Sequence, residues 1–293
     1  MKYKLIVLFL VIAIFVSGCG LLESPNNRTD NDKNIELGYI QWADIEAQTY
    51  LLKEILERLD YDVDATSLQA GPIFEGLANG DIDGYTGAWL PVTHADYWDN
   101  VKDDVVQLEP NFDGARIGLV VPEYVEIDSI TELSENAEKF DKKIVGIEPG
   151  SGVMQYTQEG AIPNHGLEEW DLIDSSGPAM TAELASAIED EEWVVVTGWL
   201  PHWKWYSFDL KFLDDPDNIY GEAETSYGVV REDLKEDMPE AYHLMNEFYL
   251  EEEAYGELIK MTTEGDTEEA AKEFVDNNLE LINEWLTEDA IIE

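Results

Sequence analysis

The sequence predicts an α/β protein of two similar lobes, each a β-sheet flanked by helices, with a cleft between them. Two observations carry this prediction. From residue 35 onward, short apolar runs alternate with amphipathic stretches, which is the pattern of strands and helices in α/β domains. A similar series of elements then recurs after an offset of about 108 residues, which is too long for a solenoid repeat and suits two lobes.

The predicted strands are short apolar runs, and they cover residues 35–42, 61–68, 81–89, 115–121, 143–147, 193–199 and 225–231. The first helix follows Asp44, a candidate N-cap, because apolar residues recur there at helical spacing. Ser129 and Glu132 have the spacing of a capping box, which predicts a helix toward Phe140. Further helices are expected over residues 151–160 and 181–191.

The last part of the chain reads as helices over residues 240–250, 254–261, 268–275 and 279–286. The simplest surface for them to pack on is the first lobe, so the chain has to cross between the lobes twice. We therefore expect one lobe to comprise residues 34–121 plus 229–293 and the other to comprise residues 122–228. The sequence places a ligand cleft between the two, at the carboxyl ends of the strands.

The first 33 residues have the composition of an export signal and a tether. Lys2 and Lys4 precede an apolar run over residues 5–16, which is too short to span a bilayer of about 30 Å and matches the core of a signal peptide. The run ends in Val-Ser-Gly-Cys, which resembles the bacterial lipobox. We expect residues 1–18 to be a signal peptide, Cys19 to be a lipid anchor on the extracytoplasmic face of the membrane, and residues 19–33 to form a flexible tether.

The charge of the chain excludes several classes of partner. It has 17 Lys and Arg against 65 Asp and Glu, for a formal net charge of −48. Such a surface repels nucleic acid and disfavours anionic membrane surfaces, because binding to either rests on basic side chains. An acidic excess of this size is typical of a halophile or alkaliphile surface. The single cysteine excludes an internal disulfide and a paired-thiol metal site.

Three tryptophans, Trp42, Trp89 and Trp199, stand at the carboxyl ends of predicted strands, and both lobes contribute. Large aromatic side chains there can simply close the ends of the sheets. They can also form a cage for a quaternary ammonium group, which has no N–H to donate. Ring faces within about 6 Å recognise such a cation and contribute about 0.5 to 2 kcal/mol each.

The segment Glu148–Val153, Glu-Pro-Gly-Ser-Gly-Val, follows a predicted strand and opens a helix. Backbone N–H groups at such a position attract an anion, and the glycines allow it to approach. The segment lacks the glycine patterns of nucleotide sites, so a carboxylate suits it better, although an ordinary loop has the same composition. His94, five residues after Trp89, is a candidate donor to the same anion, and His202 lies in the matching region of the other lobe.

Four motifs together resemble a known family, the glycine betaine/proline betaine substrate-binding lipoproteins of ABC transporters. They are Tyr-Ile-Gln-Trp at 39–42, Gly-Tyr-Thr-Gly-Ala-Trp-Leu-Pro-Val-Thr-His at 84–94, Ile-Glu-Pro-Gly-Ser-Gly-Val-Met at 147–154 and Thr-Gly-Trp-Leu-Pro-His-Trp at 197–203. The resemblance spans nearly all of residues 34–293. Members of the family differ in which lobe comes first, and here the Pro-Gly-Ser-Gly half comes second.

The resemblance implies a two-lobed type II periplasmic-binding-protein fold that needs no cofactor. It implies that Trp42, Trp89 and Trp199 form the cage for the trimethylammonium head. Backbone amides of Gly152 and Val153 hold the ligand carboxylate, assisted by His94. The expected function is a receptor for glycine betaine or a related quaternary-ammonium compatible solute, such as proline betaine, that serves osmoprotection by delivering its ligand to an ABC permease with its ATPase.

Two alternatives stay open at this point. One is a receptor of the same fold for choline or carnitine. The other is a secreted carbohydrate-active enzyme, which requires a positioned acid and base. With 65 acidic residues a carboxylate pair is found almost anywhere, and no catalytic triad or metal-ligand spacing stands out. The segment 79–84 imitates the start of an EF-hand loop, but Leu90 stands where the glutamate is required. We expect no enzyme, catalytic residue or metal site.

Overall fold

The computed structural model describes residues 33–292. The predicted signal peptide, Cys19 and the predicted tether up to residue 32 lie outside the described residues. Within 33–292, no helix is both long enough and apolar enough to cross a membrane. In that same range, no group of three or more His, Cys, Asp or Glu side chains is placed to hold a metal ion.

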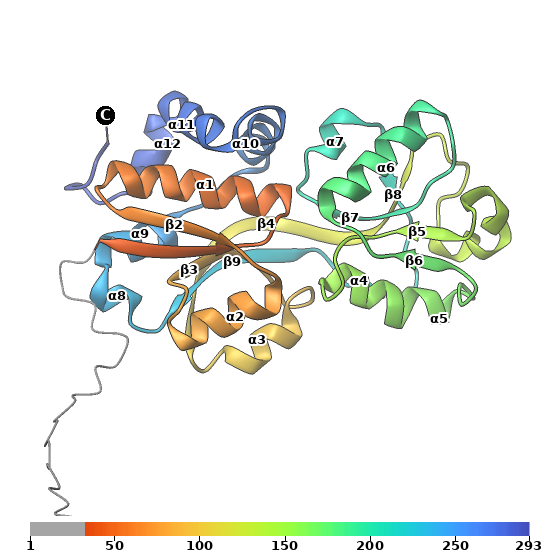
Figure 1. The fold of residues 1–293 in the computed structure, drawn as a ribbon, viewed down its shortest axis with the longest axis horizontal. Helices are drawn as coiled ribbons and strands as arrows, with labels where there is room; N and C mark the ends of the chain where they lie inside the picture. The colour runs from red at the N-terminus through yellow and green to blue at the C-terminus, as the bar shows by residue number, and fades with distance from the viewer. Residues whose placement is uncertain (1–32, 293) are drawn as a thin grey trace, which may run out of the picture.

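Figure 1 shows two lobes side by side, joined by two long strands. The strands of the first sheet are β1 (Asn34–Tyr39), β2 (Asp62–Ser67), β3 (Gly84–Leu90), β9 (Glu224–Arg231) and the first part of β4 (Val105–Pro122). Its helices within the first 101 residues are α1 (Ala43–Arg58), α2 (Ala70–Asn79) and α3 (Ala95–Val101). The apolar face of α1 is buried completely, including Ile45, Leu52 and Ile55. This burial explains the helical spacing of its apolar residues.

The second sheet continues from the far part of β4. Its other strands are β5 (Lys143–Val145), β6 (Asp171–Ile173), β7 (Val196–Leu200) and β8 (Leu210–Phe212). The helices around it are α4 (Gly152–Tyr156), a π-helical turn η3 (Thr157–Ala161), α5 (Ile162–Asn164), α6 (Gly177–Glu189) and α7 (Lys204–Ser207). The mixed α/β fold with two lobes, as predicted, is confirmed by this arrangement and by the similar solved structures reported below.

Strand β4 belongs to both sheets. It pairs with β9 as far as Ala115 and with β7 from Arg116 onward, both in antiparallel orientation. The full strand order is β2-β1-β3-β9-β4-β7-β5-β6, with β8 also paired to β4. The predicted lobe boundaries at residues 121/122 and 228/229 lie within β4 and β9, and that division stays a prediction.

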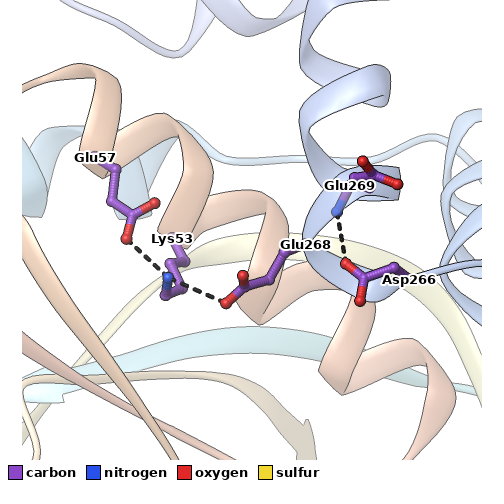
Figure 2. Close-up of polar contacts among 5 residues, drawn as sticks. All are labelled: Lys53, Glu57, Asp266, Glu268 and Glu269. Atoms are coloured by element: carbon purple, nitrogen blue, oxygen red, sulfur yellow. Dashed lines mark hydrogen bonds and ion pairs between the residues drawn. The ribbon is translucent and has the colours of Figure 1, made fainter.

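Of the C-terminal helices, the last three lie beside α1, whereas the first two lie away from α1, near β4 and β9 (Figure 1). In chain order they are α8 (Leu234–Asp237), α9 (Pro239–Glu247), α10 (Glu252–Glu264), α11 (Thr267–Asn277) and α12 (Leu279–Glu284). Figure 2 shows how α11 is attached: Lys53 Nζ lies 2.8 Å from Glu57 Oε1 on its own helix and 3.4 Å from Glu268 Oε1. Asp266 caps α11 by accepting a hydrogen bond from the Glu269 N–H at 3.1 Å.

Two local expectations differ from the structure. Ser129 and Glu132 do form a capping box, but it opens two short 3₁₀ helices, η1 (Ile130–Glu132) and η2 (Ser134–Phe140), with a non-helical break at Asn136. Asp44 does not cap α1, because the N-cap position belongs to Trp42 and has no side-chain hydrogen bond. The Asp44 carboxylate instead accepts a hydrogen bond from a residue of the other lobe.

Candidate functional site

The three predicted tryptophans meet at one narrow cavity between the lobes. Trp42 follows β1, Trp89 is in β3 and Trp199 is in β7, and all three are at least 95 % buried. The ring centroids of Trp42 and Trp199 are 6.0 Å apart with an interplanar angle of 46°. The cavity has a volume of about 10 Å³, and its remaining lining residues are Thr93, Ile117, Ile147, Ser151 and Val153. The structure therefore brings together the tryptophans and the start of α4.

Two of the indole rings are held at their edges by carboxylates across the cleft. Trp42 Nε1 donates to Glu148 Oε1 at 2.5 Å, and Trp199 Nε1 donates to Asp44 Oδ1 at 2.8 Å. Each bond joins a residue of one lobe to a residue of the other. Because the polar edges are occupied in this way, the apolar ring faces are left to line the cavity.

His94 lies directly beside the cage. Its ring stacks on Trp42, with centroids 5.7 Å apart and an interplanar angle of 11°. The Trp89 backbone N–H donates to His94 Nδ1 at 3.0 Å, so the neutral ring carries its proton on Nε2. Burial lowers the pKa of His94 to about 3, which keeps the ring neutral at physiological pH. Nε2 is buried and has no hydrogen-bond partner among the described residues.

The beginning of α4 faces the same region. Gly152 and Val153 are buried in its first turn, where backbone N–H groups have no partner within the helix. Gly152 packs closely against the loop that precedes His94, since a Cβ at position 152 would lie 2.5 Å from the Thr93 carbonyl oxygen. Tyr97 Oη donates to the Gly150 carbonyl oxygen at 2.7 Å, which adds another contact across the cleft.

His202, the second candidate, does not line the cage cavity. Its Nδ1 accepts the Lys204 N–H at 3.0 Å, and its ring meets Trp199 edge-on at 4.7 Å. It borders a wider hollow of about 210 Å³ on another side of Trp199, formed with residues of α1, α6, α10 and α11. That hollow includes neither Trp42 and Trp89 nor the start of α4, so the cage cavity is the better candidate site.

Sequence reasoning missed the residues that support the site. Glu224 accepts hydrogen bonds from the backbone N–H groups of Val92 and Thr93, at 2.6 and 2.9 Å, and from the Thr93 hydroxyl. It thereby fixes the loop between Trp89 and His94. The roles of Asp44 and Glu148 as indole acceptors were missed too. These contacts join residues more than 100 positions apart, and no local pattern signals them.

A family model described as the substrate-binding domain of an ABC-type glycine betaine transport system matches residues 33–277. Among curated proteins, the glycine betaine/carnitine transport binding protein GbuC of Listeria monocytogenes is 44% identical over 151 residues. That match spans half of this chain and half of the length of GbuC.

Solved structures are similar over most of the chain. The glycine betaine/L-proline-binding protein ProX from Borrelia burgdorferi has a TM-score of 0.83 and 35% identity, covering 88% of this chain and 98% of that one. Lactococcal OpuAC in complex with glycine betaine has a TM-score of 0.82 and 34% identity, covering 87% and 100%. A choline-binding protein in complex with choline has a TM-score of 0.81 and 25% identity, covering 89% and 96%. The chain therefore belongs to the family of substrate-binding domains of ABC-type glycine betaine transport systems, which are solute receptors.

Proposed function

We propose that this protein is a receptor for glycine betaine, proline betaine or a closely related zwitterion with a quaternary ammonium group. One observation carries the proposal: three tryptophan rings line a cavity beside a buried, neutral histidine whose donor nitrogen has no partner among the described residues. Relatives named for glycine betaine and carnitine, and a similar structure with glycine betaine bound, support this choice of ligand.

The cation end of the ligand would lie among Trp42, Trp89 and Trp199. A trimethylammonium group presents only C–H bonds, so it loses no hydrogen bond when these ring faces replace water. Each desolvated ring contributes about 0.5 to 2 kcal/mol of cation–π attraction, and three rings together account for several kcal/mol.

The carboxylate end of the ligand would accept hydrogen bonds from the backbone N–H groups of Gly152 and Val153 and from His94 Nε2. A neutral histidine serves this purpose because it donates without first taking up a proton. A ligand that lacks the carboxylate, such as choline, leaves these donors unpaired in a buried site, at about 1 to 3 kcal/mol. Choline and carnitine are the alternative ligands. The missing carboxylate of choline distinguishes it from the betaines at this site.

Binding would require the lobes to open and close. The cavity of about 10 Å³ has room for about one water molecule, whereas glycine betaine has eight heavy atoms, so the rings have to separate to admit it. We propose that residues 34–121 plus 229–293 move relative to residues 122–228, with β4 and β9 as the hinge. The hydrogen bonds of Trp42 and Trp199 across the cleft would form on closure.

We further propose that the mature protein is a lipoprotein without enzymatic activity, attached to the extracytoplasmic face of the cell membrane through Cys19 after removal of the signal peptide 1–18. The lipobox-like motif and the polar segment 19–33 support this. Its partners would be an ABC permease with its ATPase, and its uptake of betaine would serve osmoprotection. The net charge of −48 supports a halophilic or alkaliphilic setting.

Calorimetric titration of Trp89→Ala with glycine betaine tests the cage. We expect at least a tenfold loss of affinity relative to the wild type, because one ring face is removed. Trp193→Ala is the matched control, since Trp193 also carries a cation contact, with Lys139 Nζ 3.8 Å from its ring centroid, but lies outside the cavity. Equal affinity in the wild type and Trp89→Ala would contradict the cage.

A further inference from the structure

Trp199 is in contact with two buried charged side chains outside the cage cavity. The Asp44 carboxylate accepts from its Nε1 at 2.8 Å, and the Lys204 ammonium lies 4.3 Å from its ring centroid. Both side chains are fully buried. Neither of them lines the cavity between the tryptophans, so they reach Trp199 from outside it.

The two charged residues come from different lobes. Asp44 is in the first turn of α1, whereas Lys204 begins α7, shortly after β7, the strand that carries Trp199. Lys204 Nζ also lies 3.4 Å from the Trp199 carbonyl oxygen. Asp44 and Lys204 are therefore brought to the same indole ring only where the lobes meet.

The internal repeat relates Asp44 and Lys204 to the residues that are proposed to hold the carboxylate of the ligand. Lys204 stands five residues after Trp199, as His94 stands five residues after Trp89. Asp44 lies in the first turn of α1, as Gly152 lies in the first turn of α4. His94 from the first lobe and the start of α4 from the second lobe face the proposed carboxylate of the ligand. The matching places, Lys204 and the first turn of α1, hold an ammonium and a carboxylate of the chain itself.

Burial of these two groups is costly unless their charges balance. Desolvation raises the pKa of Asp44 to about 7 and lowers the pKa of Lys204 to about 7, and each charge partly opposes the shift of the other. Asp44 Oδ2 has no hydrogen-bond partner among the described residues, and the charge of the carboxylate is stabilised by the Trp199 indole, by its own backbone N–H and by the Lys204 cation. Removing one charge leaves the other buried without its balance.

We propose that Asp44 and Lys204 are positioning residues that act as one charge-balanced pair, which orients the Trp199 ring and completes the cage when the lobes meet. This inference rests on the proposed role of Trp199 as a cage ring. If the pair assembles on closure, a single unbalanced charge disfavours closure and thereby weakens ligand binding. Removing both charges together restores the balance.

The test is a double-mutant cycle on the full-length protein, with glycine betaine affinity measured by calorimetry. Asp44→Asn keeps an acceptor for the Trp199 indole and Lys204→Met keeps the length of the side chain, so both substitutions remove charge with little change of shape. We expect each single variant to bind about tenfold more weakly than the wild type, and the double variant to bind within about threefold of it. A further variant, Asp44→Ala, removes the acceptor as well and is expected to bind more weakly than Asp44→Asn.

Matched controls come from an exposed ion pair in the second lobe, Lys142 Nζ and Glu169 Oε2 at 2.9 Å. Lys142→Met and Glu169→Gln are expected to leave affinity unchanged. Single variants at Asp44 and Lys204 that bind like the wild type would overturn the inference, and so would a double variant whose loss equals the sum of the single losses. If one single variant does not fold, the other single variant and the double variant still decide between these outcomes. Absence of betaine binding by the wild type would instead refute the proposed function itself.

Discussion

Replacing each cage tryptophan with phenylalanine separates the contribution of the ring face from that of the indole N–H. Phenylalanine keeps an aromatic face in all three positions but has no group to donate. Trp89 makes no indole hydrogen bond among the described contacts, whereas Trp42 donates to Glu148 and Trp199 donates to Asp44. The three substitutions should therefore weaken binding by different amounts.

The expected order follows from the burial of the acceptors. Trp89→Phe loses only part of one cation–π contact, about 1 kcal/mol or a fivefold loss of affinity. Trp199→Phe also loses a hydrogen bond to a fully buried carboxylate, worth about 1.5 to 3 kcal/mol, or a further tenfold or more. Glu148 is only partly buried, so water can replace the indole of Trp42, and Trp42→Phe should fall between the other two.

The assay is calorimetric titration of the three variants and the wild type with glycine betaine, with thermal unfolding of each measured alongside. Trp193→Phe serves as the control and should bind like the wild type. Equal losses in all three cage variants would refute the reasoning, because the hydrogen bonds across the cleft would then contribute nothing to binding. A largest loss in Trp89→Phe would refute it equally.

Three further predictions concern stability and closure. Burial holds the pKa of His94 at about 3 in the folded state against about 6.5 in the unfolded chain, so its share of the unfolding free energy is intact above pH 6.5. As the pH falls toward 3, this contribution of His94 decreases by about 1.4 kcal/mol per pH unit. Denaturant titrations at several pH values should show this decrease in the control variant His243→Gln but not in His94→Gln. Gly152→Ala places a Cβ 2.5 Å from a carbonyl oxygen and should lower betaine affinity at least tenfold, whereas Gly265→Ala, whose Cβ meets its nearest atom at 3.4 Å, should not; equal affinities would contradict this close packing. Arg231→Met breaks the buried ion pair of Arg231 with Asp83, at 2.6 Å, and should lower the unfolding free energy by about 3 kcal/mol. A loss below about 1 kcal/mol would contradict a stabilising role of this ion pair.

The repeating pattern of apolar runs predicted the order of strands and helices well. The strand over 225–231 and the four C-terminal helices lie within a few residues of their predicted bounds. The pattern did not show that β4 extends over residues 105–122, because its first part carries charged and polar residues among the apolar ones. Pairing with β9 on one side keeps that part extended, and such pairing is a tertiary effect.

The candidate site was predicted in part. The positions of Trp42, Trp89 and Trp199 at strand ends predicted that the three side chains lie close together, and in the structure these strand ends converge at the cleft. The sequence also suggested Asp44 as an N-cap, because aspartate before an apolar helix is the usual signal. Its actual partner, the Trp199 indole, is 155 residues away, and only the docking of the two lobes brings them together.

Titration of the wild-type protein with glycine betaine, choline and glycine in high salt tests the proposed site most directly. We predict micromolar binding of glycine betaine, about −8 kcal/mol, and much weaker binding of choline and of glycine. Choline lacks the carboxylate for Gly152, Val153 and His94, and glycine lacks the trimethylammonium group for the tryptophans. Choline binding as tight as betaine would remove the carboxylate site, and absence of binding by both would contradict the cage.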